Sequence, residues 1–119
     1  MKITLWLDVH DREPQHNPAI YSRVLETSAL PCGEDEIVLY PWEDSPDDGP
    51  GAQPRRRTLA ADGTWHIHLT KYLLNPNERG EPMLKAQDRN GQYKWSALSG
   101  ENAAECAERL VRQGWIKIW

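Results

Sequence analysis

The sequence is short of the residues that mark several functional classes. Its 119 residues include no Phe, two Met and only two Cys. Cys32 and Cys106 lie far apart and have no Cys-x-x-Cys spacing, which argues against both a disulfide scaffold and a zinc ribbon. We therefore expect two reduced thiols in a cytoplasmic protein.

Long apolar runs are also missing. The first residues, MKITLWLDVHDR, hold a short apolar run that Asp8 closes, and they lack the small-residue cleavage pattern of a signal peptide. No stretch approaches the roughly 18 apolar residues that cross a bilayer as a helix. The sequence predicts a soluble intracellular chain with no membrane insertion.

Familiar catalytic signatures are absent as well. The chain has no Gly-x-Ser-x-Gly elbow, no phosphate-cradling glycine loop and no His-Glu-x-x-His pair. Cys106 falls on the apolar face of a predicted helix, where a buried and inert thiol is expected. An enzyme is therefore the minor interpretation, and we expect no cofactor.

Charge is divided unevenly between the two halves of the chain. Residues 1–54 hold 11 acidic and 3 basic side chains, whereas residues 55–119 hold 7 acidic and 11 basic ones. Such a split can steer a partner or join two halves of one fold. The single basic run is Arg55, Arg56 and Arg57, and because phosphate contacts need clustered cations, nucleic-acid binding is disfavoured.

Alternation of apolar and polar residues predicts several strands. The segments KITLWLDV at 2–9 and EIVLYPW at 36–42 have strand patterns, whereas AIYSRVLE at 19–26 fits a strand or a short helix, and we favour the strand. Two hairpins are predicted, with turns at Asp62-Gly63 and Asn90-Gly91.

An acidic loop and a helix complete the predicted organisation. Residues 43–54, EDSPDDGPGAQP, have three prolines and almost no apolar side chains, so we expect a flexible loop that either recruits a basic partner or is a tolerated insertion. Residues 99–114 predict a helix from an N-cap at Ser99 to a C′ residue at Gly114. Its predicted apolar face is Ala103, Cys106, Ala107, Leu110 and Val111, with Glu105–Arg109 and Glu108–Arg112 pairs opposite.

The expected fold is a single α+β domain over residues 1–119. We predict a curved, mostly antiparallel sheet of about five to seven strands, built of hairpins, with the one C-terminal helix packed on it. The final WIKIW carries large side chains on both faces, so we predict a short C-terminal strand paired inside the sheet.

The stretch ADGTWHIHL, residues 61–69, looks most like chemistry. Period two sends Trp65, Ile67 and Leu69 to one face and His66 and His68 to the other. Two histidines can bind a metal, but a site needs a third and usually a fourth ligand. Asp8 and His10 are weak candidates for these if the first strand lies beside this one; otherwise both histidines are solvated on a hairpin.

Six tryptophans point to a binding surface, because Trp and Tyr in excess of a small core tend to lie at interfaces. We expect Trp6, Trp65 and Trp95 in the core and Trp42 and Trp119 exposed, although all six packing in one core is the alternative. The candidate partner-binding residues are Trp42, its acidic neighbours Glu43 and Asp44, and Trp119.

A short chain without Phe, heavy in Trp, Arg, Pro and Ala, with hairpins and one helix, resembles the small accessory proteins of phages that infect high-GC actinobacteria. The resemblance is compositional, spans the whole chain and assigns no residue a role. It implies a non-enzymatic module that binds a host or phage protein and interferes with a host protein. The alternatives are a metal- or histidine-dependent enzyme using the His66-x-His68 strand and a weak nucleic-acid binder using Arg55 to Arg57. The partner's identity and the oligomeric state stay open.

Overall fold

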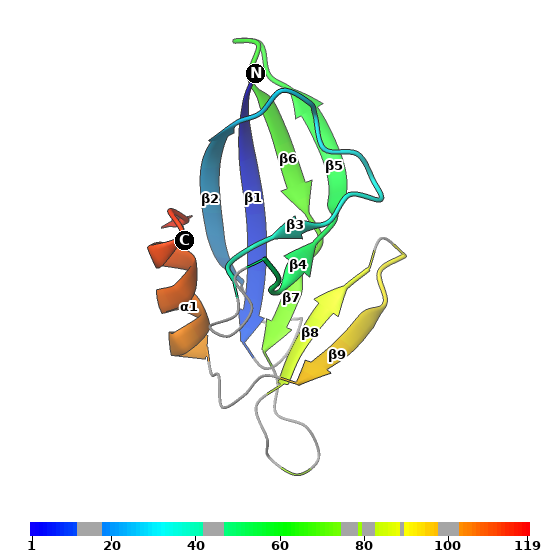
Figure 1. Cartoon of the computed structure of the whole chain (residues 1–119), viewed down its shortest axis with the longest axis vertical. Helices are drawn as coiled ribbons and strands as arrows, with labels where there is room; N and C mark the ends of the chain where they lie inside the picture. The colour runs from blue at the N-terminus through cyan, green and yellow to red at the C-terminus, as the bar shows by residue number, and fades with distance from the viewer. Residues whose placement is uncertain (12–17, 42–46, 75–78, 80–82, 89, 98–102) are drawn as a thin grey trace.

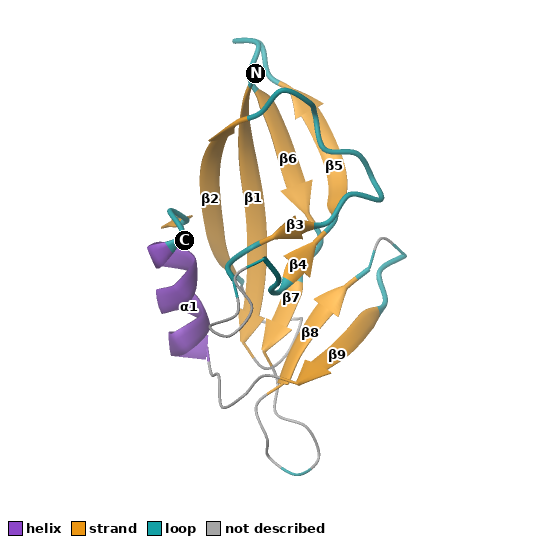
Figure 2. Ribbon diagram, in the orientation of Figure 1, coloured by secondary structure: helices purple, strands orange, loops and turns teal. Residues whose placement is uncertain are grey.

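The computed structural model describes residues 1–11, 18–41, 47–74, 79, 83–88, 90–97 and 103–119 (Figure 1). Within them the chain is mostly β-structure with one helix, and the main sheet is mixed and open (Figure 2). The predicted α+β class is confirmed in this coarse form. The elements are, in chain order, β1 Lys2–Asp11, β2 Ala19–Glu26, β3 Ile37–Val38, β4 Gly51–Ala52, β5 Pro54–Leu59, β6 Trp65–Leu69, β7 Tyr72–Leu74, β8 Met83–Gln87, β9 Tyr93–Ala97, α1 Ala103–Arg112 and β10 Ile116–Lys117.

Strand β1 is the centre of the main sheet and has neighbours on both edges. On one edge it pairs antiparallel with β2, from Lys2 opposite Glu26 to Val9 opposite Ala19. On the other edge it pairs in parallel with β6 near its start and with β7 near its end. The described strands of this sheet number eight, one more than predicted, and the parallel centre was not part of the prediction.

Strands β6 and β7 follow β1 with a one-residue shift between them. Ile3 lies opposite Trp65, whereas Val9 lies opposite Tyr72, so one extra residue is accommodated between the two strands. Thr70 lies at this shift and is buried; its amide donates to the Gln53 carbonyl at 2.9 Å, and its Oγ1 accepts from the Gln53 amide at 3.1 Å. These bonds stabilise the extra residue between β6 and β7. Because of that residue, both strands direct apolar side chains to the core face of the sheet.

The outer strands come from local pairings. The β5–β6 and β8–β9 hairpins turn at Asp62-Gly63 and at Asn90-Gly91, so both predicted hairpins are confirmed. Strand β10 pairs antiparallel with the other edge of β2, with Ile116 opposite Ser22. The predicted C-terminal strand is therefore present and paired, but it does not lie in the interior of the sheet, because β10 is the last strand in the sheet order.

The segment around β3 and β4 differs from its prediction. Among the described residues 36–41 of the expected strand, Ile37 and Val38 are the ones paired as a strand, and Leu39 and Tyr40 leave it to enter the core. The expected loop through residue 54 has a different extent, because residues 51–52 form β4, in which Ala52 is buried, and Pro54 begins β5. Backbone pairing with β3 and burial against the sheet order this part, despite its prolines and glycines.

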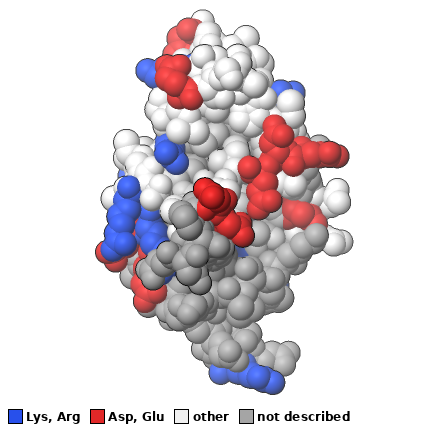
Figure 3. Space-filling model, in the orientation of Figure 1, with Lys and Arg blue, Asp and Glu red and all other residues white. Residues whose placement is uncertain are grey.

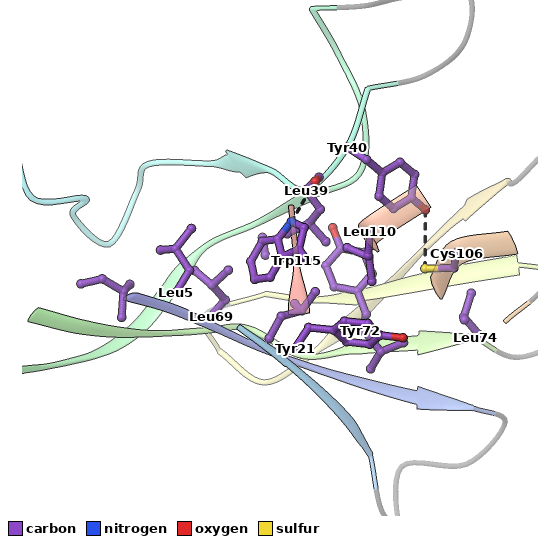
Figure 4. Close-up of a cluster of buried hydrophobic side chains, with 14 of the residues drawn as sticks. Leu5, Tyr21, Leu39, Tyr40, Leu69, Tyr72, Leu74, Cys106, Leu110 and Trp115 are labelled. Carbon is purple, nitrogen blue, oxygen red and sulfur yellow. Dashed lines mark hydrogen bonds between the residues drawn. The ribbon is translucent and has the colours of Figure 1, made fainter. Parts of the chain in front are cut away.

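Trp115 fills the centre of the core between the sheet, the helix and the β3–β4 segment (Figure 4). Its indole Nε1 donates a hydrogen bond to the Leu39 carbonyl oxygen at 3.0 Å. Nearby, the Tyr40 hydroxyl donates to the Cys106 sulfur at 3.6 Å. Aromatic side chains thus donate hydrogen bonds to the buried Cys106 sulfur and to the buried Leu39 carbonyl oxygen. These bonds connect residues 39–40 to the C-terminal part of the chain.

The tryptophans are distributed differently from the prediction. Trp115, which was not assigned to the core, is fully buried, whereas Trp65 is only partly buried and packs against the core. Trp6 is partly buried, and the alternation along β1 places it on the face opposite the core. Trp95 lies in β9, and its side chain falls outside the described part.

The end of α1 delivers Trp115 to the core. Gly114 has φ of 92°, its amide donates to the Val111 carbonyl at 3.1 Å, and the Trp115 amide donates to the Leu110 carbonyl at 3.1 Å. This is a Schellman motif with buried Leu110 and Trp115 in apolar contact, so the predicted C′ role of Gly114 is confirmed.

The helix face is confirmed in part. Cys106 and Leu110 are buried, and the Glu108–Arg112 ion pair forms at 2.6 Å. Val111 is strongly exposed, so its assignment to the apolar face is wrong: the helix turns it away from the core. Ser99, the predicted N-cap, lies outside the described residues.

We expect Trp115→Ala to lower the free energy of unfolding by about 3–5 kcal/mol, because it empties the centre of the core. Trp119→Ala should change it by less than about 0.5 kcal/mol, because that residue lies at the surface. The two side chains are 1% and 71% exposed, respectively. Urea denaturation of both variants followed by circular dichroism measures the difference; equal losses would contradict this core.

A second stability test concerns the described part of the 43–54 segment, residues 47–54. A Cβ added to Gly49 would lie 1.9 Å from the Tyr40 backbone oxygen, so the backbone itself must move. We expect Gly49→Ala to cost about 1–3 kcal/mol of unfolding free energy, as overpacking does. Asp47→Ala, at an exposed neighbouring position, is the matched control and should be nearly neutral. A neutral Gly49→Ala would show that this segment is not packed.

Candidate functional site

The face of the main sheet away from the core carries an unusual set of side chains, and we call it the open face. Along β1 the odd-numbered residues enter the core, and the even-numbered residues point the other way. The strand pairings extend this second face across the neighbouring strands. The open face consists of Thr4, Trp6 and Asp8 from β1, Ile20, Ser22 and Val24 from β2, His66 and His68 from β6, Arg56 and Thr58 from β5, and Ile116 with Ile118 at β10.

One row of this face crosses five strands and changes character along its length. Each member lies opposite the next in the strand register: Ile116, Ser22, Trp6, His68 and Arg56. The row therefore begins with an aliphatic residue, passes an indole at the centre and ends with an imidazole and a guanidinium.

The apolar end of the open face, defined here as Ile20, Val24, Ile116 and Ile118, lies on β2 and β10. Val24, Ile116 and Ile118 are strongly exposed, although they are β-branched residues of the kind that normally fills a core. The Ile118 amide donates to the Ile20 carbonyl at 2.7 Å, so the segment after β10 is held against β2. Neighbouring exposed apolar residues on a sheet face are typical of an interaction site.

The imidazole end of the open face consists of Trp6, His66, His68 and Arg56. The Trp6 indole Nε1 donates to Nδ1 of His66 at 3.0 Å. Its ring is stacked with both imidazoles, at 6.1 Å and 22° from His66 and at 6.3 Å and 15° from His68. Because Nδ1 of His66 accepts this bond, the proton of the neutral ring lies on Nε2.

His68 lies in a positive environment. Its Nε2 is 3.5 Å from Nη2 of Arg56 across the β5–β6 ladder. Burial lowers the pKa of His68, the nearby charges of Arg56 and Arg55 lower it further, and Asp8 acts weakly in the opposite direction. Near neutral pH this ring is therefore an uncharged imidazole beside a fixed cation.

The weak metal candidates share a face but do not converge. Strand β1 does lie beside β6, as the proposed set required, yet His10 is buried further along β1, opposite Leu73 of β7. Nδ1 of His66 is occupied by the Trp6 indole. In the part of the chain that the structure describes, no three His, Cys, Asp or Glu side chains are placed to hold a metal ion, and the set Asp8, His10, His66 and His68 is not such a group.

Of the four predicted partner-binding residues, the described part of the chain includes Trp119. Trp42, Glu43 and Asp44 lie outside the described residues. Trp119 is strongly exposed beside the apolar end, where its carbonyl accepts from the Ile20 amide at 3.2 Å. Sequence reasoning missed Ile116, Ile118 and Val24, because alternation alone does not tell which face of an edge strand meets the core.

The opposite side of the molecule is acidic. Acidic side chains gather on the side that carries β3 and β4, as Figure 3 shows. Residues 27–54 include no Lys or Arg. The exposed acidic residues described in this region are Glu34, Asp35, Glu36, Asp47 and Asp48. The acidic first half of the sequence thus supplies the acidic surface around β3 and β4.

Comparison of the chain with protein-family models, with curated proteins and with solved structures finds no match. No helix among the described residues has the length and apolar character that crossing a membrane requires.

Chemically, the open face is suited to binding. A general base needs an imidazole nitrogen that faces substrate and a partner that favours its protonated form. Here the indole of Trp6 takes Nδ1 of His66, and Arg56 opposes protonation of His68. The exposed aliphatic, aromatic and cationic groups instead provide a contact surface.

Stability should depend on pH through His68. The pKa of His68 in the folded chain lies below its ordinary value of 6.5. As pH falls from the ordinary pKa towards the lowered one, the unfolded chain binds more protons than the folded chain, so the free energy of unfolding decreases. We expect His68→Gln to lose less unfolding free energy than the native chain between about pH 7.5 and 5.5. Arg56→Gln should also reduce the pH dependence, because it removes the cation that opposes the imidazolium. Identical pH profiles for all three proteins, measured by urea denaturation, would contradict this environment.

Proposed function

We propose that this chain is a non-enzymatic protein-binding accessory module that docks its partner on the open face of the sheet. The observation that carries the proposal is the apolar end, where Val24, Ile116 and Ile118 are exposed together on one face. An antiparallel sheet face turned to water normally presents polar side chains. Three exposed β-branched residues on one face are better explained by a partner that covers them.

The apolar end is also well prepared for binding. Val and Ile have few rotamers, so little side-chain entropy is lost when a partner immobilises them. Strand β2 is held to β1 along its whole length, and β10 is anchored by the buried Trp115 that precedes it. The surface is therefore rigid, and contact with a partner needs little rearrangement.

The compositional resemblance to phage accessory proteins supports the same class of function and would make the partner a host or phage protein. Trp42, Glu43 and Asp44 remain proposed contacts in addition to Trp119. The alternatives receive less support from the geometry. An enzyme using His66 and His68 lacks a free Nδ1 on His66, and a nucleic-acid site on β5 is divided, because Arg56 and Arg57 lie on opposite faces of the strand.

The test uses two matched substitutions. Ile118 and Leu59 are 54% and 56% exposed, but Leu59 lies near the β5–β6 turn, far from the apolar end. We expect Ile118→Asp to stay folded and to lose the partner by at least about thirtyfold in affinity, as for an interface hot spot. Leu59→Asp should keep the partner.

The partner is first identified by photo-crosslinking from position 118 in the native host, with position 59 as the control, followed by mass spectrometry. Affinity for the purified partner is then measured by calorimetry for the native chain and both variants. Equal affinities of the native chain and Ile118→Asp, or equal losses in both variants, would reject the open face as the docking surface.

A further inference from the structure

We infer that the imidazole end of the open face receives a carboxylate, so that the partner is an acidic segment carrying apolar side chains beside its Asp or Glu. This inference rests on the proposed function, because it assigns the chemistry of the partner that the open face docks. The carboxylate is placed at Arg56 and His68, and the apolar side chains are placed at the other end of the same row.

The charges around Arg56 favour an anion. The charged or titratable groups near His68 are Arg56 and Arg55 on β5, His66 on β6 and Asp8 on β1. In the described part of the chain, no acidic side chain forms an ion pair with Arg56, whose guanidinium lies at the surface. A planar guanidinium offers five N–H donors, and a carboxylate can take two of them in parallel.

The spacing of the row restricts how the partner lies. Adjacent strands are about 4.8 Å apart, so Arg56 and Ile116 at the two ends of a five-strand row are separated by roughly 19 Å. One partner segment can reach both ends only if it crosses the strands. The partner therefore lies across the face, as a helix of about four turns or a short extended segment would, with Trp6 under its middle.

Proton binding distinguishes this site from a merely exposed arginine. A bound carboxylate would favour the imidazolium form of His68, opposing the effect of Arg56 and Arg55. By linkage, affinity should then rise as pH falls, and the complex should take up a proton. Removal of His68 should abolish this part of the pH dependence while the Arg56 contact persists.

The experiment selects displayed random peptides of about 16 residues, long enough to span the row as a helix, on the native protein. Selected peptides are then measured by fluorescence anisotropy against Ile118→Asp, Arg56→Gln and Arg57→Gln. Arg57 is the matched control, because it carries the same charge on the same strand but faces the opposite side, opposite Ile67.

We expect the peptides that bind Ile118→Asp more weakly than the native protein to contain Asp or Glu near apolar residues. Their affinity should fall about tenfold with Arg56→Gln and stay unchanged with Arg57→Gln. Replacing the peptide's acidic residue with Gln should lower the affinity by the same factor. Combined with Arg56→Gln, this replacement should cause little further loss of affinity, as a double-mutant cycle requires for a direct contact. In the native chain, affinity should rise from about pH 7.5 to 5.5, and His68→Gln should flatten this rise.

Two results separate this inference from the proposed function. If open-face peptides lack acidic residues, or if Arg56→Gln and Arg57→Gln act equally, the carboxylate site is overturned while docking on the open face stands. If acidic peptides depend on Arg56 but are unaffected by Ile118→Asp, the carboxylate site stands and the apolar docking surface is overturned. A selection that yields no peptide sensitive to either position overturns both.

Discussion

The edge of β1 that faces β6 and β7 constrains the rest of the sheet. Two parallel neighbours share this edge, and the shift at Thr70 keeps Tyr72 and Leu74 on the core side after Ile67 and Leu69. Without the extra residue, Tyr72 and Leu74 would turn away from the core, because a shift of one position exchanges the two faces of a strand. The buried hydrogen bonds between Thr70 and Gln53 hold the shift in place and also fix where β5 begins.

The core and the open face are coupled through Trp115. Its burial and its hydrogen bond to Leu39 fix the chain directly before β10. The next residue, Ile116, then has to point to the opposite side, next to Ser22 and in line with Trp6. The outward direction of Ile116 is therefore a geometric consequence of the core, and changes to the helix end that displace Trp115 should also disturb this part of the open face.

Local patterns accounted for much of the fold but for less of the site. Alternation located β1 and β2, turn residues located both hairpins, and Gly114 marked the end of α1, because each signal acts within a few residues. The parallel pairing of β1, the burial of Ala52 and the central place of Trp115 depend on contacts between distant segments, which no local pattern encodes. For the same reason, the sequence placed His66 and His68 on the face away from the core but did not place Trp6 against both of them, or Ile116 and Ile118 beside Ser22 and Ile20.

The pairing of β10 with β2 also determines when the surface can exist. Ile116 and Ser22 belong to segments near opposite ends of the described chain, and contacts of such large sequence separation form late, after the loops between them have closed. A chain still emerging from the ribosome has β1 and β2 but lacks Trp115 and the aliphatic residues that follow it. Until Trp115 and the residues after it have been made, the core lacks its central side chain and β2 lacks the strand that pairs with its outer edge. The same contact that completes the core therefore also completes the apolar end of the open face.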